Sequence, residues 1–126
     1  MAKRKSKEEP ARERRIRMEI VVDAYGAEEQ AMGWYCYLQD GLGFPFTAKC
    51  VAERAISPLR KGDEVEVCGM APEEECGHEM FVCIRRERRS LGVPLSQLEP
   101  IARTDADTKQ AVADWHYWVE QGYEFG

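Results

Sequence analysis

The strongest constraint on the fold is a series of short extended segments, separated by turn residues, between residues 44 and 95. Apolar and polar side chains alternate in residues 44–53 and again in residues 64–67. A period of two places successive side chains on opposite faces of a β-strand. Residues 80–86 and 91–95 continue the series, so the sequence predicts four or five short antiparallel strands joined by tight turns.

Two longer segments show helical periodicity instead. In residues 27–40, apolar side chains recur at intervals of three and four, which places them on one stripe of a helix that Gly41 ends. Residues 105–121 show a second apolar stripe. Thr104 with Asp107 resembles a capping box at the start of this second helix.

Strands enclosed between helices predict an α+β fold. Residues 16–25 favour a short helix ahead of the longer ones, because Glu19 and Asp23 lie four residues apart on one face. The predicted architecture is a small SH3-like antiparallel β-barrel, flanked by N-terminal helices and a C-terminal helix. A length of 126 residues suits one domain, which we place at residues 16–126.

Charge is unevenly distributed along the chain. Residues 1–17 hold eight Lys/Arg and three Glu, a net +5, so the remainder carries −10 of the total of −5. Because residues 1–15 have few apolar side chains, they are predicted to form a disordered basic tail. The tail could contact nucleic acid or an anionic surface, or fold back on the acidic domain. The composition favours a solubilising tail without a specific partner.

The chain is expected to be cytoplasmic. No stretch approaches the roughly 18 consecutive apolar residues needed to cross a bilayer, and no apolar segment follows the basic N-terminus. The chain has five cysteines, an odd number that argues against a complete disulfide framework. We therefore expect reduced thiols, such as Cys50 and Cys83 inside predicted strands.

The densest concentration of charge is the acidic loop, residues 71–79, between two predicted strands. It holds four glutamates within seven residues: Glu73, Glu74, Glu75 and Glu79. Adjacent like charges repel, and carboxylate oxygens are the ligands that Ca²⁺ prefers, so a bound cation would stabilise the loop. On composition alone, an acidic run of this kind is more commonly a solvated surface.

Any calcium site in this chain must combine separate segments, because no EF-hand loop of the form D-x-[DN]-x-[DN]-G-x₅-E is present. Asp40, at the end of predicted helix 27–40, is the expected second half, since a helix C-terminus also exposes carbonyl oxygens. The predicted metal ligands are Asp40, Glu73, Glu74, Glu75 and Glu79.

Other chemistries have less support. Cys76 and His78 could ligate zinc, but structural zinc sites use paired motifs such as C-x₂-C, and the sequence has none. His116 is on an amphipathic helix, where a histidine is more commonly a boundary residue than a base, so an enzyme is not predicted. The arginines of residues 85–89 could bind nucleic acid, but a net charge of −10 opposes phosphate. An SH3-like protein- or nucleic-acid-interaction module is the alternative function.

Several longer strings carry a recognisable pattern: residues 20–25, 31–40, 44–48, 69–76, 93–98 and 114–118. They resemble the CcbP family of small prokaryotic calcium-binding proteins without EF-hands, over roughly residues 18–125. The resemblance implies reversible Ca²⁺ binding through surface carboxylates, as a buffer or sensor in calcium signalling. It carries over the acidic loop together with Asp40. Gly41, Gly43 and Gly77 depart from the family pattern, which predicts a looser site.

The expected partner is therefore Ca²⁺, bound by a monomer. A sensor would also need a protein partner, which the sequence does not identify. Neither nucleic acid nor a membrane is expected as a partner.

Overall fold

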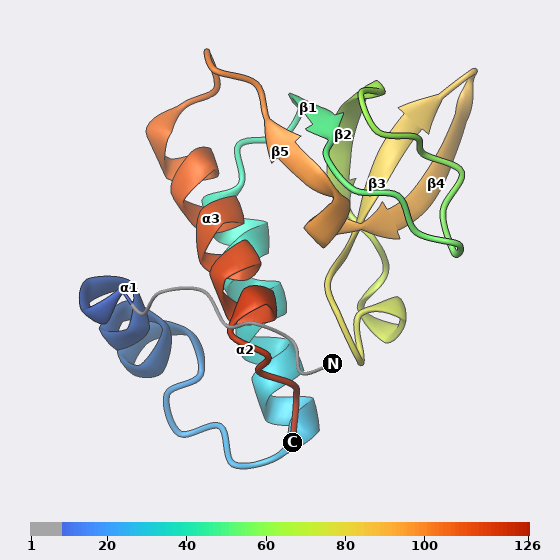
Figure 1. Ribbon diagram of the computed structural model, residues 1–126. Coiled ribbons are helices and arrows are strands. Elements are labelled where there is room, and N and C mark those ends of the chain that lie inside the picture. Colours follow the sequence, from blue (N-terminus) through green and yellow to red (C-terminus); the bar gives the residue numbers. More distant parts are fainter. Residues whose placement is uncertain (1–8) are drawn as a thin grey trace, which may run out of the picture.

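The computed structural model describes residues 9–126, which form one antiparallel sheet with helices packed beside it (Figure 1). The strands are β1 (Phe46–Cys50), β2 (Glu64–Met70), β3 (Phe81–Arg86), β4 (Arg89–Pro94) and β5 (Leu98–Pro100). Their order across the sheet is β4-β3-β2-β1-β5, and every neighbouring pair is antiparallel. The predicted α+β class and antiparallel strands are confirmed.

The sheet is open, so the predicted closure into an SH3-like barrel is not confirmed. Strands β4 and β5 lie at opposite edges of the sheet, and no ladder joins them within residues 9–126. A single 3₁₀ turn, η3 (Leu95–Gln97), separates the two strands and redirects the chain. As a result, all three residues of β5 pair with β1 at the far edge.

Helices α2 (Ala27–Gly41) and α3 (Ala106–Glu120) form a layer beside the sheet (Figure 1). Their contact is centred on Trp34 and Trp115, whose rings meet edge to face with centroids 5.0 Å apart. Both side chains are almost fully buried and belong to the core that the sheet shares. None of the helices in residues 9–126 is long and apolar enough to cross a membrane.

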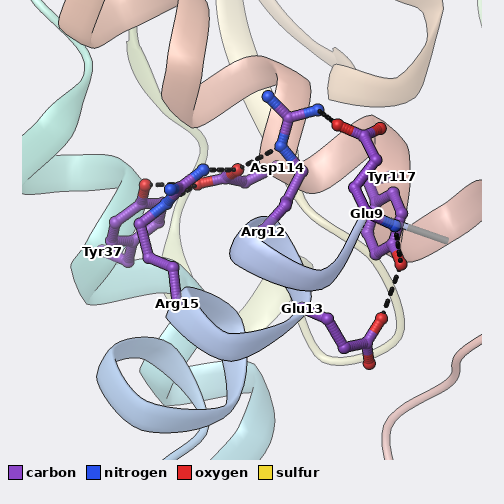
Figure 2. A network of polar contacts seen from close by, with 7 residues as sticks. All are labelled: Glu9, Arg12, Glu13, Arg15, Tyr37, Asp114 and Tyr117. Carbon is purple, nitrogen blue, oxygen red and sulfur yellow. Dashed lines mark hydrogen bonds and ion pairs between the residues drawn. The ribbon is translucent and has the colours of Figure 1, made fainter.

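The N-terminal segment differs from the prediction. Residues 1–8 of the predicted tail lie outside the described residues, whereas α1 (Pro10–Arg15) and the π-helical turn η1 (Ile16–Ile20) are helical. They lie on the side of the helical layer away from the sheet (Figure 1). Helix α1 buries no residue of its own, so apolar content could not reveal it. Contacts of its arginines with Asp114 hold it in place (Figure 2).

The start of α3 also differs in detail. Asp105, rather than the predicted Thr104, caps the helix, because its carboxylate accepts from the Thr108 backbone N–H at 2.9 Å. This hydrogen bond, and a second one from the Thr108 hydroxyl, lower the pKa of Asp105. The Thr108 hydroxyl in turn accepts from the backbone N–H of Gly43 at 2.8 Å, which ties the end of α2 to the start of α3.

Candidate metal centre

The acidic loop connects β2 to β3 and is attached to the core at two points, Ala71 at its start and Cys76 in its middle. The hydroxyl of Tyr35, on α2, donates to the carbonyl of Ala71 at 2.9 Å. The thiol of Cys76 accepts from the Phe81 backbone N–H at 3.4 Å and donates to its carbonyl at 3.6 Å. Ala71 and Cys76 are buried. Glu73, Glu74 and Glu75 therefore lie between two buried residues that anchor the loop backbone.

Between these anchors, Glu73, Glu74 and Glu75 form one 3₁₀ turn, η2, and all three side chains are exposed. Consecutive residues of a 3₁₀ helix point about 120° apart, so the three carboxylates diverge. The Glu75 carboxylate lies over Gly92 of β4, where its Oε1 is 3.7 Å from the position a Cβ would occupy. Because they diverge, the three carboxylates are accessible to a cation but do not converge on one metal-binding position.

Glu73 and Glu74 are near enough to Tyr35 of α2 to influence its ionisation. The pKa of Tyr35 is raised, first by burial and then by nearby ionisable groups that include both glutamates. A negative carboxylate disfavours the phenolate, which explains the sign of their contribution.

Glu79, at the end of the loop, already forms an ion pair with an arginine side chain. Its Oε2 lies 2.6 Å from Nη1 of Arg54, and this arginine also reaches the Ser96 hydroxyl at 3.4 Å. The Glu79 carboxylate raises the pKa of Arg54. Arg54 therefore competes with a metal ion for the Glu79 carboxylate. The sequence did not suggest this pair, because its members are 25 residues apart.

Asp40 is exposed in the last turn of α2. The acidic loop meets α2 at Tyr35, and Asp40 lies five residues, or about 7.5 Å, farther along the helix axis. Among residues 9–126, no three His, Cys, Asp or Glu side chains converge closely enough to hold a metal ion. The structure thus brings Glu73, Glu74 and Glu75 together in one turn, while a shared site with Asp40 stays a prediction.

Cys76 and His116 have structural roles. Burial is the main reason that the pKa of Cys76 is raised, and Glu75 and Glu73 add to it, so this thiol anchors the loop as a neutral group. His116 contacts the carbonyl of Leu98 through Nε2 at 2.7 Å, which joins α3 to β5. The apolar residues inside the charged loop, Ala71 and Cys76, are the sequence signal that could have identified its anchors.

Comparison with known proteins supplies the family. The sequence profile of a family described as calcium binding, Calci_bind_CcbP, matches residues 14–119. The chain belongs to the CcbP calcium-binding family. The match confirms the resemblance seen in the sequence. The family is defined by binding Ca²⁺ rather than by a reaction.

Two solved structures are similar to this CcbP-family protein. The crystal structure of CcbP from Anabaena is 42% identical and covers 95% of this chain and 98% of its own, with a TM-score of 0.84. A calcium-binding protein in its calcium-binding form is also 42% identical and covers 93% of this chain and 95% of its own, with a TM-score of 0.82. No curated protein sequence matches the chain.

Proposed function

We propose that this CcbP-family protein binds Ca²⁺ reversibly through the acidic loop and acts as a cytoplasmic calcium buffer or sensor. The observation that carries the proposal is the set of exposed carboxylates at Glu73, Glu74 and Glu75, between buried anchors at Ala71 and Cys76. The anchors fix the backbone, while the glutamate side chains keep their rotamer freedom. They can therefore turn towards a cation without unfolding of the loop.

The donor chemistry suits Ca²⁺, a hard cation that prefers carboxylate and carbonyl oxygens. Bound Ca²⁺ would neutralise the mutual repulsion of the three glutamates. Asp40 is the proposed ligand from α2, and Glu79 is a further proposed ligand for which Arg54 competes. Binding to the folded state stabilises the protein by mass action. A sensor differs from a buffer only in having a partner that recognises the changed surface.

The alternative function, a nucleic-acid-interaction module, would use the arginines of the β3–β4 hairpin. Two of them already have intramolecular partners. Arg85 lies 3.8 Å from the Glu66 carboxylate, and Arg86 donates to the carbonyl of Pro58 at 3.5 Å. These contacts, together with the acidic balance of the domain, favour calcium binding over nucleic-acid binding.

Calorimetric titration of chelator-stripped protein with Ca²⁺ tests the proposal. We expect saturable heat and a higher melting temperature in millimolar Ca²⁺. Changing Glu73, Glu74 and Glu75 together to Gln should abolish the heat.

The matched control changes three exposed glutamates outside the loop, Glu64, Glu66 and Glu99, to Gln and so removes the same charge. This control should keep most of the affinity. Equal losses in the two triple variants would show that general electrostatics, rather than the acidic loop, holds the ion.

A further inference from the structure

We propose that the protein docks on anionic lipid surfaces through an N-terminal patch formed by Arg14, Arg17, Met18, Val22 and Tyr25. This interaction is separate from calcium binding and uses the opposite side of the helical layer. Figure 1 shows η1 and the connection to α2 on the side away from the sheet, which carries the acidic loop.

The first observation is a concentration of exposed apolar side chains. Within residues 9–126, four of the six exposed large hydrophobic residues lie between positions 18 and 32. Met18 is 59% exposed, Val22 49% and Tyr25 84%. The fourth, Met32, is next to Gly33, where α2 packs against the backbone of Ile20. Single exposed apolar residues are normal, whereas a cluster on one segment marks an interaction surface.

The second observation is that the arginines of this segment divide between two faces. Arg12 and Arg15 point inward to Asp114. Arg17 and Met18 lie three and four residues after Arg14, so the three side chains share the other face of the helical segment. Together with Pro10 and Glu13, these three residues line a surface hollow. Cations and a flexible apolar side chain are thus presented together.

The third observation is the charge asymmetry of the chain. Residues 9–25, which include the patch, balance at four Lys/Arg against four Asp/Glu, whereas residues 26–126 contain ten against 18. An anionic surface repels residues 26–126 but not this balanced segment, so the molecule would approach patch first. Arginines then reach lipid phosphates while Met18, Val22 and Tyr25 enter the boundary between headgroups and acyl chains.

These features favour lipid over other partners. A nucleic acid would engage the arginines but offers the aliphatic side chains no apolar phase. A two-fold dimer through the patch would place Arg14 and Arg17 of one copy against the same basic patch of the other. A bilayer with acidic headgroups satisfies both the charge and the apolar surface.

The test is flotation of the full chain with vesicles of phosphatidylcholine alone or mixed with phosphatidylglycerol. EDTA is present throughout, so calcium binding does not enter the result. We expect binding to the mixed vesicles only, weakened by salt. Absence of binding to the mixed vesicles would overturn the proposal.

Two matched pairs of variants identify the patch. Met18→Ser should weaken vesicle binding at least about threefold, while Ile56→Ser, at a site 60% exposed elsewhere, should leave it unchanged. Changing Arg14 and Arg17 to Gln should weaken binding about tenfold, while the same change at the exposed Arg88 and Arg89 should have little effect. An unchanged melting temperature confirms that each variant is folded.

Three outcomes would overturn the assignment. The first is an equal loss of vesicle binding in the patch and control variants. The second is that the protein binds a single-stranded oligonucleotide instead of the vesicles, and that Met18→Ser does not weaken this oligonucleotide binding. The third is a dimer in sedimentation that Met18→Ser dissociates.

Discussion

Nη2 of Arg15 lies 2.6 Å from Oδ1 of Asp114, although the two residues are 99 positions apart in the chain (Figure 2). The Asp114 carboxylate is 0% exposed, and it also accepts from Arg12 Nε at 2.8 Å and from the Tyr37 hydroxyl at 2.6 Å. Hydrogen bonding to Asp114 raises the pKa of Arg15. One buried carboxylate therefore joins α1 to both α2 and α3.

Replacing Asp114 with Asn should lower the free energy of unfolding by about 3 kcal/mol, because two arginines lose a buried acceptor. Both arginines are partly exposed, so water replaces some of the lost interaction and keeps the loss at the low end of the range for buried pairs. Urea denaturation measures the change. Asp107→Asn, at an exposed position of α3, is the control. A loss below about 1 kcal/mol would contradict a structural role for the network.

Tyr37 should make stability depend on pH in the alkaline range. Burial, and then its hydrogen bond to Asp114, raises the pKa of Tyr37 from 10.0 to about 12. As pH rises, the unfolded state loses this proton first, so the stabilisation is complete below about pH 10 and is lost between about pH 10 and 12.

Denaturation at a series of pH values should show a shallower decline over this window for Tyr37→Phe than for the unchanged protein. The variant should also lose about 1 kcal/mol at neutral pH, with the hydrogen bond. Tyr25→Phe, which changes a highly exposed phenol, serves as the control. An unaltered slope for Tyr37→Phe would mean that another group causes the alkaline loss.

Gly33 permits the N-terminal segment to pack on α2. A Cβ at this position would collide with the carbonyl of Ile20, a backbone atom that cannot simply rotate away. Gly33→Ala should therefore destabilise the protein by about 2 kcal/mol. In an open helix the same change normally stabilises by about 1 kcal/mol.

The control for Gly33 is Gly41→Ala in the same helix, where the added Cβ would make an ordinary contact with Ala111 at 3.5 Å. Thermal melting distinguishes the two glycines. Equal melting temperatures for the two variants would show that the N-terminal segment shifts freely.

Arg54 should compete with Ca²⁺ for Glu79. Arg54→Met frees the carboxylate and removes a positive charge beside the acidic loop, so we expect Ca²⁺ affinity to rise about three- to tenfold. Calorimetry compares this variant with Arg60→Met, an exposed arginine of the same connection between β1 and β2. An equal gain in both variants would leave Glu79 outside the site.

Asp40 can be tested separately from the loop. If Asp40 ligates the ion, Asp40→Asn should weaken Ca²⁺ binding about fivefold, because one carboxylate ligand is lost. The melting temperature of the calcium-free protein should stay the same, since Asp40 is exposed. Unchanged affinity would remove Asp40 from the ligand set and leave the loop as the proposed site.

Local periodicity was enough to predict the regular elements. Predicted helices 27–40 and 105–121 correspond to Ala27–Gly41 and Ala106–Glu120. Strands β2 and β3 likewise enclose the acidic loop, as the alternation on either side of it indicated. Each of these elements is set by side chains a few residues apart, and a single sequence displays that spacing directly.

Tertiary structure alone decided which charges pair and how the sheet ends. Glu79 forms an ion pair with Arg54. Asp114 binds arginines of α1, a segment that the composition had assigned to a disordered tail. The sheet is open because η3 sends β5 to the edge beside β1. These outcomes depend on which residues, far apart in the chain, lie close together in space, because the attraction between two charges weakens with the distance between them. The sequence thus determined the elements and the acidic loop, whereas the fold determined which carboxylates remain free for an ion.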